Sequence, residues 1–118
     1  MTFGKVYREF KDHTGARVCW YWRDRFNTHG KHTLHPEYDE AGFDDTIQTC
    51  LSKATMICLD KDNPNRKCFY LDQSHLGDPN RKFLKIVVDY NTLGFLSPTI
   101  ITSHYVNEVS PRDTKLWP

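Results

Sequence analysis

Three histidines, His29, His32 and His35, stand at three-residue intervals in the 118-residue chain. Imidazoles at regular spacing can bind a metal ion, but Gly30 and Pro36 interrupt the segment, so one continuous helix cannot align all three. Side chains in a solvated loop are the simplest interpretation. A third interpretation is acid–base chemistry at His35. Pro36 suits the start of a short helix, and the N-terminal end of a helix favours a neutral imidazole.

A second set of chemically active side chains lies in the C-terminal half. Alternation along the segment 83–90 places Lys85 on the face opposite the aliphatic residues of that segment. Alternation along 99–104 places Thr102 and His104 on one common face, and strand register decides whether Lys85 shares it. We expect a site on a sheet face that carries a lysine, hydroxyl groups and an imidazole.

The chain lacks the sequence motifs of several other functional classes. The chain contains no glycine-rich phosphate loop, no G-x-S-x-G, no paired-carboxylate motif and no dinucleotide fingerprint. Its four cysteines form no C-x-x-C pair and are expected to be free thiols. With a mean hydropathy of −0.68, no apolar run of membrane-spanning length and no secretory signal at the start, we expect a cytoplasmic protein without a membrane partner.

The elements that must position these residues indicate a single α+β domain over residues 1–118. Segments 6–10 and 17–22 read as a β-hairpin, and apolar residues from Phe43 to Leu51 recur at helical spacing. Four strands are expected after the helix, at 55–59, 67–71, 83–90 and 99–104. Their connections are too short for crossover helices, so we predict a four-stranded antiparallel sheet with one or two short helices on one face. That face should carry Leu84, Ile86 and Val88, packed against Phe43, Ile47 and Leu51.

Two tryptophans of the hairpin, Trp20 and Trp22, fall on the same face by alternation. They either pack over the core or form a platform on which unpaired RNA bases stack.

The order of these features resembles the phage-type branch of the barnase–EndoU–colicin–RelE superfamily of small ribonucleases. The resemblance covers about residues 15 to 110. It lies in the hairpin, His35-Pro36-Glu37, the amphipathic helix and the four strands, with the sequence Thr102-Ser103-His104 in the last strand. Family members carry a basic residue before the His of His-Pro-Glu, whereas Leu34 stands there in this chain, so a phosphate-contacting cation must come from elsewhere, such as Lys31 or Lys85.

The resemblance implies cleavage of RNA without a metal or a small-molecule cofactor. The 2′-hydroxyl would attack its own phosphate and leave a 2′,3′-cyclic phosphate, which needs a base, a cation and an acid. The implied roles are His35 as base or acid, and Lys85 with Arg66 or Arg81 as electrostatic stabilisers. Proton donation or hydrogen bonding falls to Tyr70, Thr102 or His104. The implied RNA contacts are Lys31, Arg66, Arg81, Trp20 and Trp22.

Such a ribonuclease could be a toxin or a phage effector in a bacterial host or phage-infected cell, with an antitoxin or inhibitor protein as partner. Three alternatives remain. The fold could serve as a catalytically silent RNA- or protein-binding module. It could be a toxin of the RelE and ParE kind that acts by binding. It could also be a metal-dependent hydrolase that uses the three spaced histidines.

Overall fold

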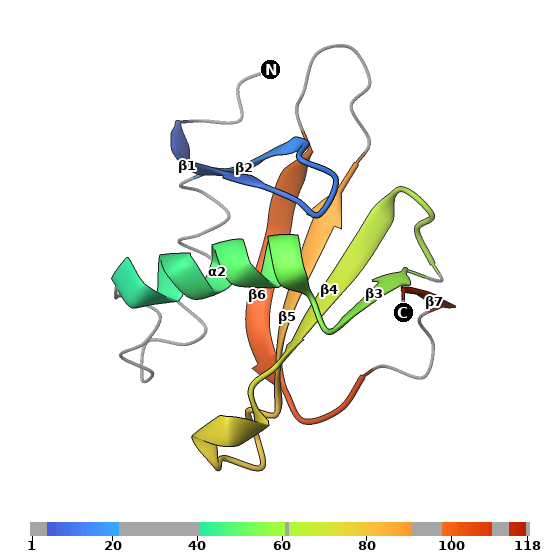
Figure 1. Ribbon diagram of the computed structural model, residues 1–118. Coiled ribbons are helices and arrows are strands. Elements are labelled where there is room, and N and C mark those ends of the chain that lie inside the picture. The colour runs from blue at the N-terminus through green and yellow to red at the C-terminus, as the bar shows by residue number, and fades with distance from the viewer. Residues whose placement is uncertain (1–4, 22–40, 61, 91–97, 110–113, 118) are drawn as a thin grey trace.

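The computed structural model describes residues 5–21, 41–60, 62–90, 98–109 and 114–117. These residues form one sheet of seven strands and one α-helix (Figure 1). In chain order the elements are β1 (Val6–Lys11), β2 (Arg17–Tyr21), α2 (Ala41–Lys53), β3 (Met56–Leu59), β4 (Arg66–Asp72), the 3₁₀ turn η2 (Ser74–Leu76), β5 (Phe83–Asp89), β6 (Thr99–Val106) and β7 (Thr114–Trp117).

The strand order across the sheet is β1-β2-β6-β5-β4-β3-β7. The hairpin β1–β2 and the antiparallel meander from β3 to β6 confirm the elements predicted from alternation. The predicted four-stranded antiparallel sheet is nevertheless wrong. The sheet is mixed, because β2 joins β6 in parallel at Cys19 and Thr99, and β7 extends the opposite edge beside β3.

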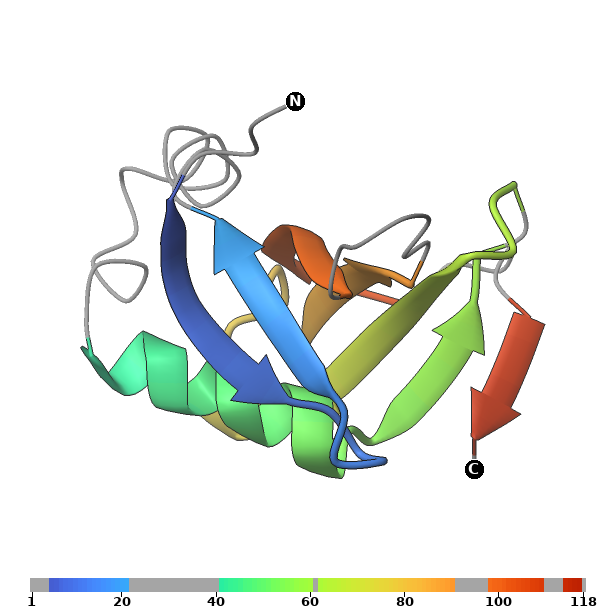
Figure 2. The same ribbon diagram turned by 90° about the horizontal axis from the view of Figure 1, so that it is seen from above.

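The helix α2 lies across one face of the sheet (Figure 2). Its apolar stripe of Phe43, Ile47 and Leu51 is buried in a core with residues of β5, in agreement with the predicted face assignment. The aliphatic side chains that β5 contributes are Leu84, Ile86 and Val88. Burial of large aliphatic side chains on this face provides the main driving force for docking the helix.

Polar contacts attach the helix to the first strand of the hairpin. Asp44, in the first turn of α2, accepts a hydrogen bond from the hydroxyl of Tyr7 and pairs with Arg8 at 3.4 Å. One turn further on, the side-chain amide of Gln48 bonds both the backbone N–H and the carbonyl of Lys11, at 3.1 and 2.8 Å. These bonds satisfy backbone groups of the edge strand β1.

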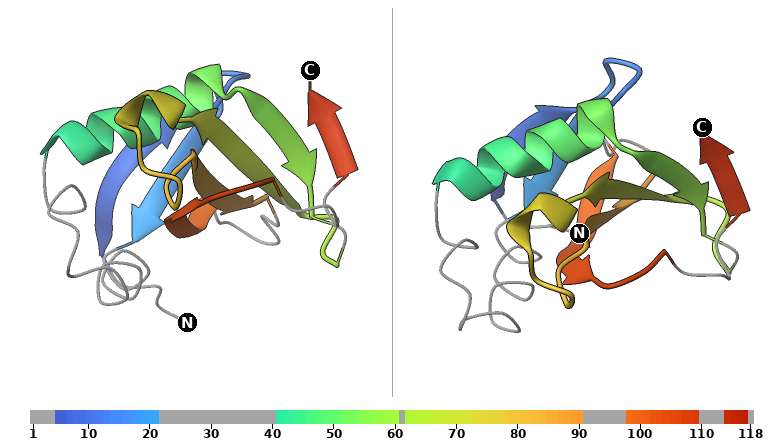
Figure 3. Two further views of the ribbon diagram at one scale, coloured as in Figure 1. Left: turned by 90° about the horizontal axis from the view of Figure 1, so that it is seen from below. Right: turned by 60° about the horizontal axis from the view of Figure 1, so that its bottom comes forward.

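The other face of the sheet, called the second face below, carries a smaller cluster formed by Cys58, Cys68, Tyr70 and Val87. Val109, which follows β6, packs on this cluster. Figure 3 shows residues 107–109, directly after β6, running from the end of that strand toward the edge of the sheet that holds β3 and β7. The second face is therefore partly covered by the chain itself and is less open than strand alternation suggested.

Candidate active site

The second face brings three of the predicted site residues into one row. Tyr70 of β4 lies directly opposite Lys85 of β5, and Lys85 lies directly opposite His104 of β6. Directly opposed residues in an antiparallel pair have Cβ atoms about 4.5–5.5 Å apart and project from the same face. An ammonium group and an imidazole are thus neighbours on one surface.

Thr102 belongs to the same surface. It lies opposite Val87, one row away from Lys85, and shares its face with His104 two residues further along β6. The register between β5 and β6 shifts between Val87 and Val88, where β6 carries an additional residue. Before the shift along β6, Ile100 points into the helix-side core. After the shift, Thr102 and His104 point to the second face. The register thus places both residues with Lys85, which the sequence alone left undecided.

Lys85 is held by aromatic packing. Its Nζ lies 5.4 Å from the centroid of the Tyr70 ring, and the rings of Tyr70 and Phe83 form a T-shaped pair with centroids 6.2 Å apart. A cation over an aromatic face is attracted by the quadrupole of the ring, and more strongly where water is partly excluded. Lys85 is half-buried, as are His104 and Thr102. The ring of Tyr70 therefore limits where the ammonium can lie.

Tyr70, which was predicted to donate a proton or a hydrogen bond, has a buried side chain. The residue is 0% exposed, because the second-face cluster surrounds it. A proton donor to a substrate must come within hydrogen-bond reach of it. Tyr70 therefore lies beneath the ammonium group of Lys85, and its buried side chain does not meet this requirement.

Arg66 also reaches the second face, at the opposite end of β4. It lies opposite Asp89 of β5, and its Nε is 3.5 Å from Oδ2 of Asp89. The carboxylate offsets much of the positive charge that Arg66 would offer to phosphate. Asp89 was not among the predicted site residues, although it stands four positions after Lys85 and so shares its face of the strand by alternation.

The remaining predicted contacts lie elsewhere. Trp20 is 1% exposed and packs in the helix-side core against Tyr7 and Phe10, so it is not available as a stacking platform for bases. Arg81 lies with its guanidinium over the ring of Tyr105, away from the row of Lys85 and His104. Trp22, Lys31 and His35 lie outside the described residues, as do His29 and His32.

Metal-ligating side chains do not gather anywhere within the described ranges: no group of three or more His, Cys, Asp or Glu residues occurs there. The four cysteines, at 19, 50, 58 and 68, are free and buried in the structure. Within the same ranges, no helix is long and apolar enough to cross a membrane.

The arrangement on the second face offers a half-buried cation, an imidazole and a hydroxyl on adjacent strands. Together they can stabilise a developing negative charge and transfer a proton. No protein-family model matches the chain, and comparisons with curated proteins and with solved structures likewise return no match.

Proposed function

We propose that this chain is a metal-independent endoribonuclease whose reaction takes place on the second face, around Lys85 and His104. The observation that carries the proposal is the direct cross-strand pairing of these two half-buried residues, with Thr102 on the same surface. A cation beside an imidazole, which can both donate and accept a proton, suits phosphoryl transfer from RNA.

In the proposed reaction, the 2′-hydroxyl of RNA attacks the adjacent phosphorus, and the bond from phosphorus to the 5′-oxygen breaks. Lys85 stabilises the negative charge that develops on the phosphoryl oxygens. His104 transfers one of the two protons that must move, and the Thr102 hydroxyl hydrogen-bonds a phosphoryl oxygen. The second proton is transferred by His35, a role that the sequence resemblance implies. The products are a 2′,3′-cyclic phosphate and a 5′-hydroxyl.

The proposed substrate class is RNA, in the setting that the resemblance implies: a toxin or phage effector inside a bacterial cell. Its charge contacts with RNA would weaken as salt is raised, because phosphate contacts release counterions. A ribonuclease in such a setting would require an antitoxin or inhibitor protein, which is part of the same proposal.

The test is single-turnover cleavage of end-labelled RNA in excess chelator, with analysis of the fragment ends. We expect cyclic phosphate and 5′-hydroxyl ends, and we expect His104→Ala to slow cleavage by about 10²–10⁴-fold. His13→Ala, at an exposed histidine of the hairpin turn, is the matched control and should cleave at the wild-type rate. Wild-type protein that binds RNA but cleaves none of a broad set of RNAs would contradict the proposal and favour a binding module.

A further inference from the structure

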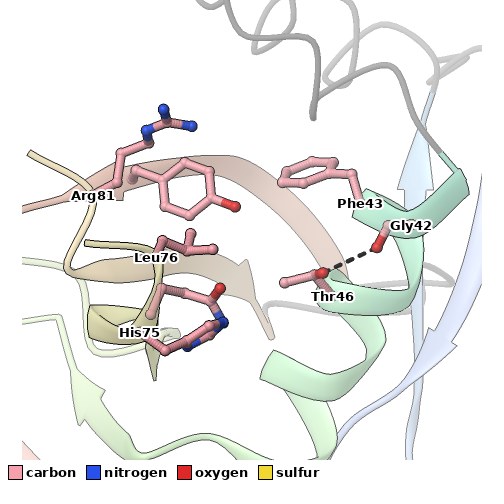
Figure 4. A pocket seen from close by; sticks show the side chains of 8 residues that line it. Gly42, Phe43, Thr46, His75, Leu76 and Arg81 are labelled. Carbon is pink, nitrogen blue, oxygen red and sulfur yellow. Dashed lines mark hydrogen bonds between the residues drawn. The ribbon is translucent and has the colours of Figure 1, made fainter. Parts of the chain in front are cut away.

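A hollow of about 450 Å³ lies on the helix side of the sheet, separate from the row of Lys85 and His104. Figure 4 shows Gly42, Phe43 and Thr46 of α2 along one side, with His75, Leu76 and Arg81 facing them across the hollow. Gln73 and Tyr105 complete its lining. Tyr105 lies opposite Leu84 of β5 and therefore projects from the helix-side face, whereas the adjacent His104 projects from the second face. The volume falls within the range of small-molecule sites.

A fixed guanidinium forms part of this lining. The Arg81 side chain lies over the ring of Tyr105, with its Cζ 5.8 Å from the ring centroid, and its Nε is bound to Oδ2 of Asp78 at 2.8 Å. Two independent contacts therefore hold the planar group in place, and the ion pair with Asp78 offsets part of its positive charge, as Asp89 does for Arg66. A planar guanidinium suits both stacking on an aromatic ligand and hydrogen bonding to phosphate.

The hollow also offers hydrogen-bonding groups beside its apolar walls. Gln73 is only 9% exposed and its backbone N–H is bound to the carbonyl of Lys82, while within the described residues its side-chain amide makes no hydrogen bond. Burial raises the pKa of Tyr105, against an opposing effect of Arg81, so its hydroxyl remains protonated at neutral pH. The imidazole of His75 lies at the exposed side.

These groups point to a ligand that is planar, carries both a donor and an acceptor on one edge, and bears an anionic group. An amide pairs through its oxygen and nitrogen with N6 and N7 of adenine. Apolar and aromatic walls, supplied here by Phe43, Leu76 and Tyr105, favour the base, and Arg81 favours its phosphate. We propose that this hollow binds an adenine nucleotide, either free or as one residue of an RNA strand.

The test is calorimetric titration of the full chain with 5′-AMP and 5′-UMP, and with short oligoadenylate and oligouridylate. We expect AMP to bind at least about tenfold more tightly than UMP, a difference that an edge-reading amide can supply. Saturable binding of AMP indicates a free-nucleotide site, and tight binding of oligoadenylate with weak binding of AMP indicates a subsite for an RNA residue. Both results support adenine recognition and remain distinct from RNA cleavage at His104.

Variants locate the binding within the hollow. Gln73→Leu should remove the preference for AMP over UMP, and Arg81→Gln should weaken AMP by about tenfold while changing adenosine little, because adenosine has no phosphate. Lys82→Gln, at an exposed neighbour, is the control for general loss of positive charge. If a variant fails to fold, shifts of the wild-type Leu76 methyl and Tyr105 ring signals on addition of AMP provide the same test. Equal binding of AMP and UMP, or AMP binding that Arg81→Gln and Lys82→Gln weaken alike, would overturn the proposal.

Discussion

The hydroxyl of Tyr90 donates a 2.6 Å hydrogen bond to Oδ2 of Asp12, 78 positions away in the chain. Asp12 is 4% exposed, and its other oxygen, Oδ1, accepts bonds from the backbone and hydroxyl of Thr14 and from the backbone of Ala16. Gly15, at φ 85°, completes the turn in a conformation that favours glycine. One carboxylate thus shapes the β1–β2 turn and binds it to the residue that follows β5.

Asp12 makes the free energy of unfolding depend on pH in the acidic range. Burial by itself would raise the pKa of Asp12, but hydrogen bonds from Tyr90, Thr14 and Ala16 outweigh this effect and hold the pKa below its usual value. The unfolded chain has the higher pKa, so the stabilisation is complete above about pH 4 and is lost as pH falls through the folded-state pKa.

We therefore predict that Asp12→Asn lowers the free energy of unfolding at neutral pH by about 1–3 kcal/mol and flattens its fall towards low pH. Urea unfolding at a series of pH values measures both effects. Asp45→Asn, at an exposed position of α2, is the control. If the free energy of unfolding of Asp12→Asn falls toward low pH as steeply as that of the wild type, other carboxylates cause this fall.

The helix-side core depends on Ile86, which is fully buried beneath α2. Ile86→Ala removes apolar contacts and leaves a cavity, so we expect it to lower the free energy of unfolding by about 2–5 kcal/mol. Thermal and urea unfolding measure the loss. Val6→Ala, at a 40% exposed position of the edge strand, should change stability by less than about 0.5 kcal/mol. A melting temperature of Ile86→Ala equal to that of the wild type would contradict the core assignment.

Local patterns in the sequence were sufficient to predict the hairpin, the helix and the buried face of β5. Period-two alternation specifies which residues share a face of one strand, and helical spacing specifies the stripe from Phe43 to Leu51. The parallel pairing of Cys19 with Thr99 has no such local signal, because it joins segments far apart in the chain. The short strand β7 was missed for the same reason.

The candidate site was predictable only in part. Alternation grouped Thr102 with His104, but the extra residue of β6 near Ile101 changes the register, and only the paired strands show that both lie with Lys85. Tyr70 is buried in a cluster on which residues of other segments pack, among them Val109 from beyond the end of β6. Packing of this kind is a tertiary effect that strand pattern does not encode.

The four cysteines should be unreactive in the folded protein. All are buried, and burial raises the pKa of the Cys50 thiol far above neutrality, so its reactive thiolate is suppressed. We predict that an alkylating reagent modifies the native protein slowly and that the denatured protein, without reductant, returns four free thiols. Mass spectrometry before and after denaturation counts the modified groups. Two or more missing thiols in the denatured protein would indicate a disulfide.

Substitution of Lys85 distinguishes a role in catalysis from a role in RNA binding. If its ammonium stabilises charge on the phosphoryl oxygens in the transition state, Lys85→Ala should slow single-turnover cleavage by about 10²–10³-fold at saturating protein. Lys82→Ala removes the same charge at an exposed position close by and should leave that rate unchanged. If Lys85 only contacts the RNA backbone, its loss should instead weaken RNA binding with a reduced salt dependence, and the cleavage rate of bound RNA should stay the same. Melting curves of both variants confirm that they are folded at the assay temperature. Equal saturated rates for Lys85→Ala and the wild type would remove Lys85 from the proposed reaction.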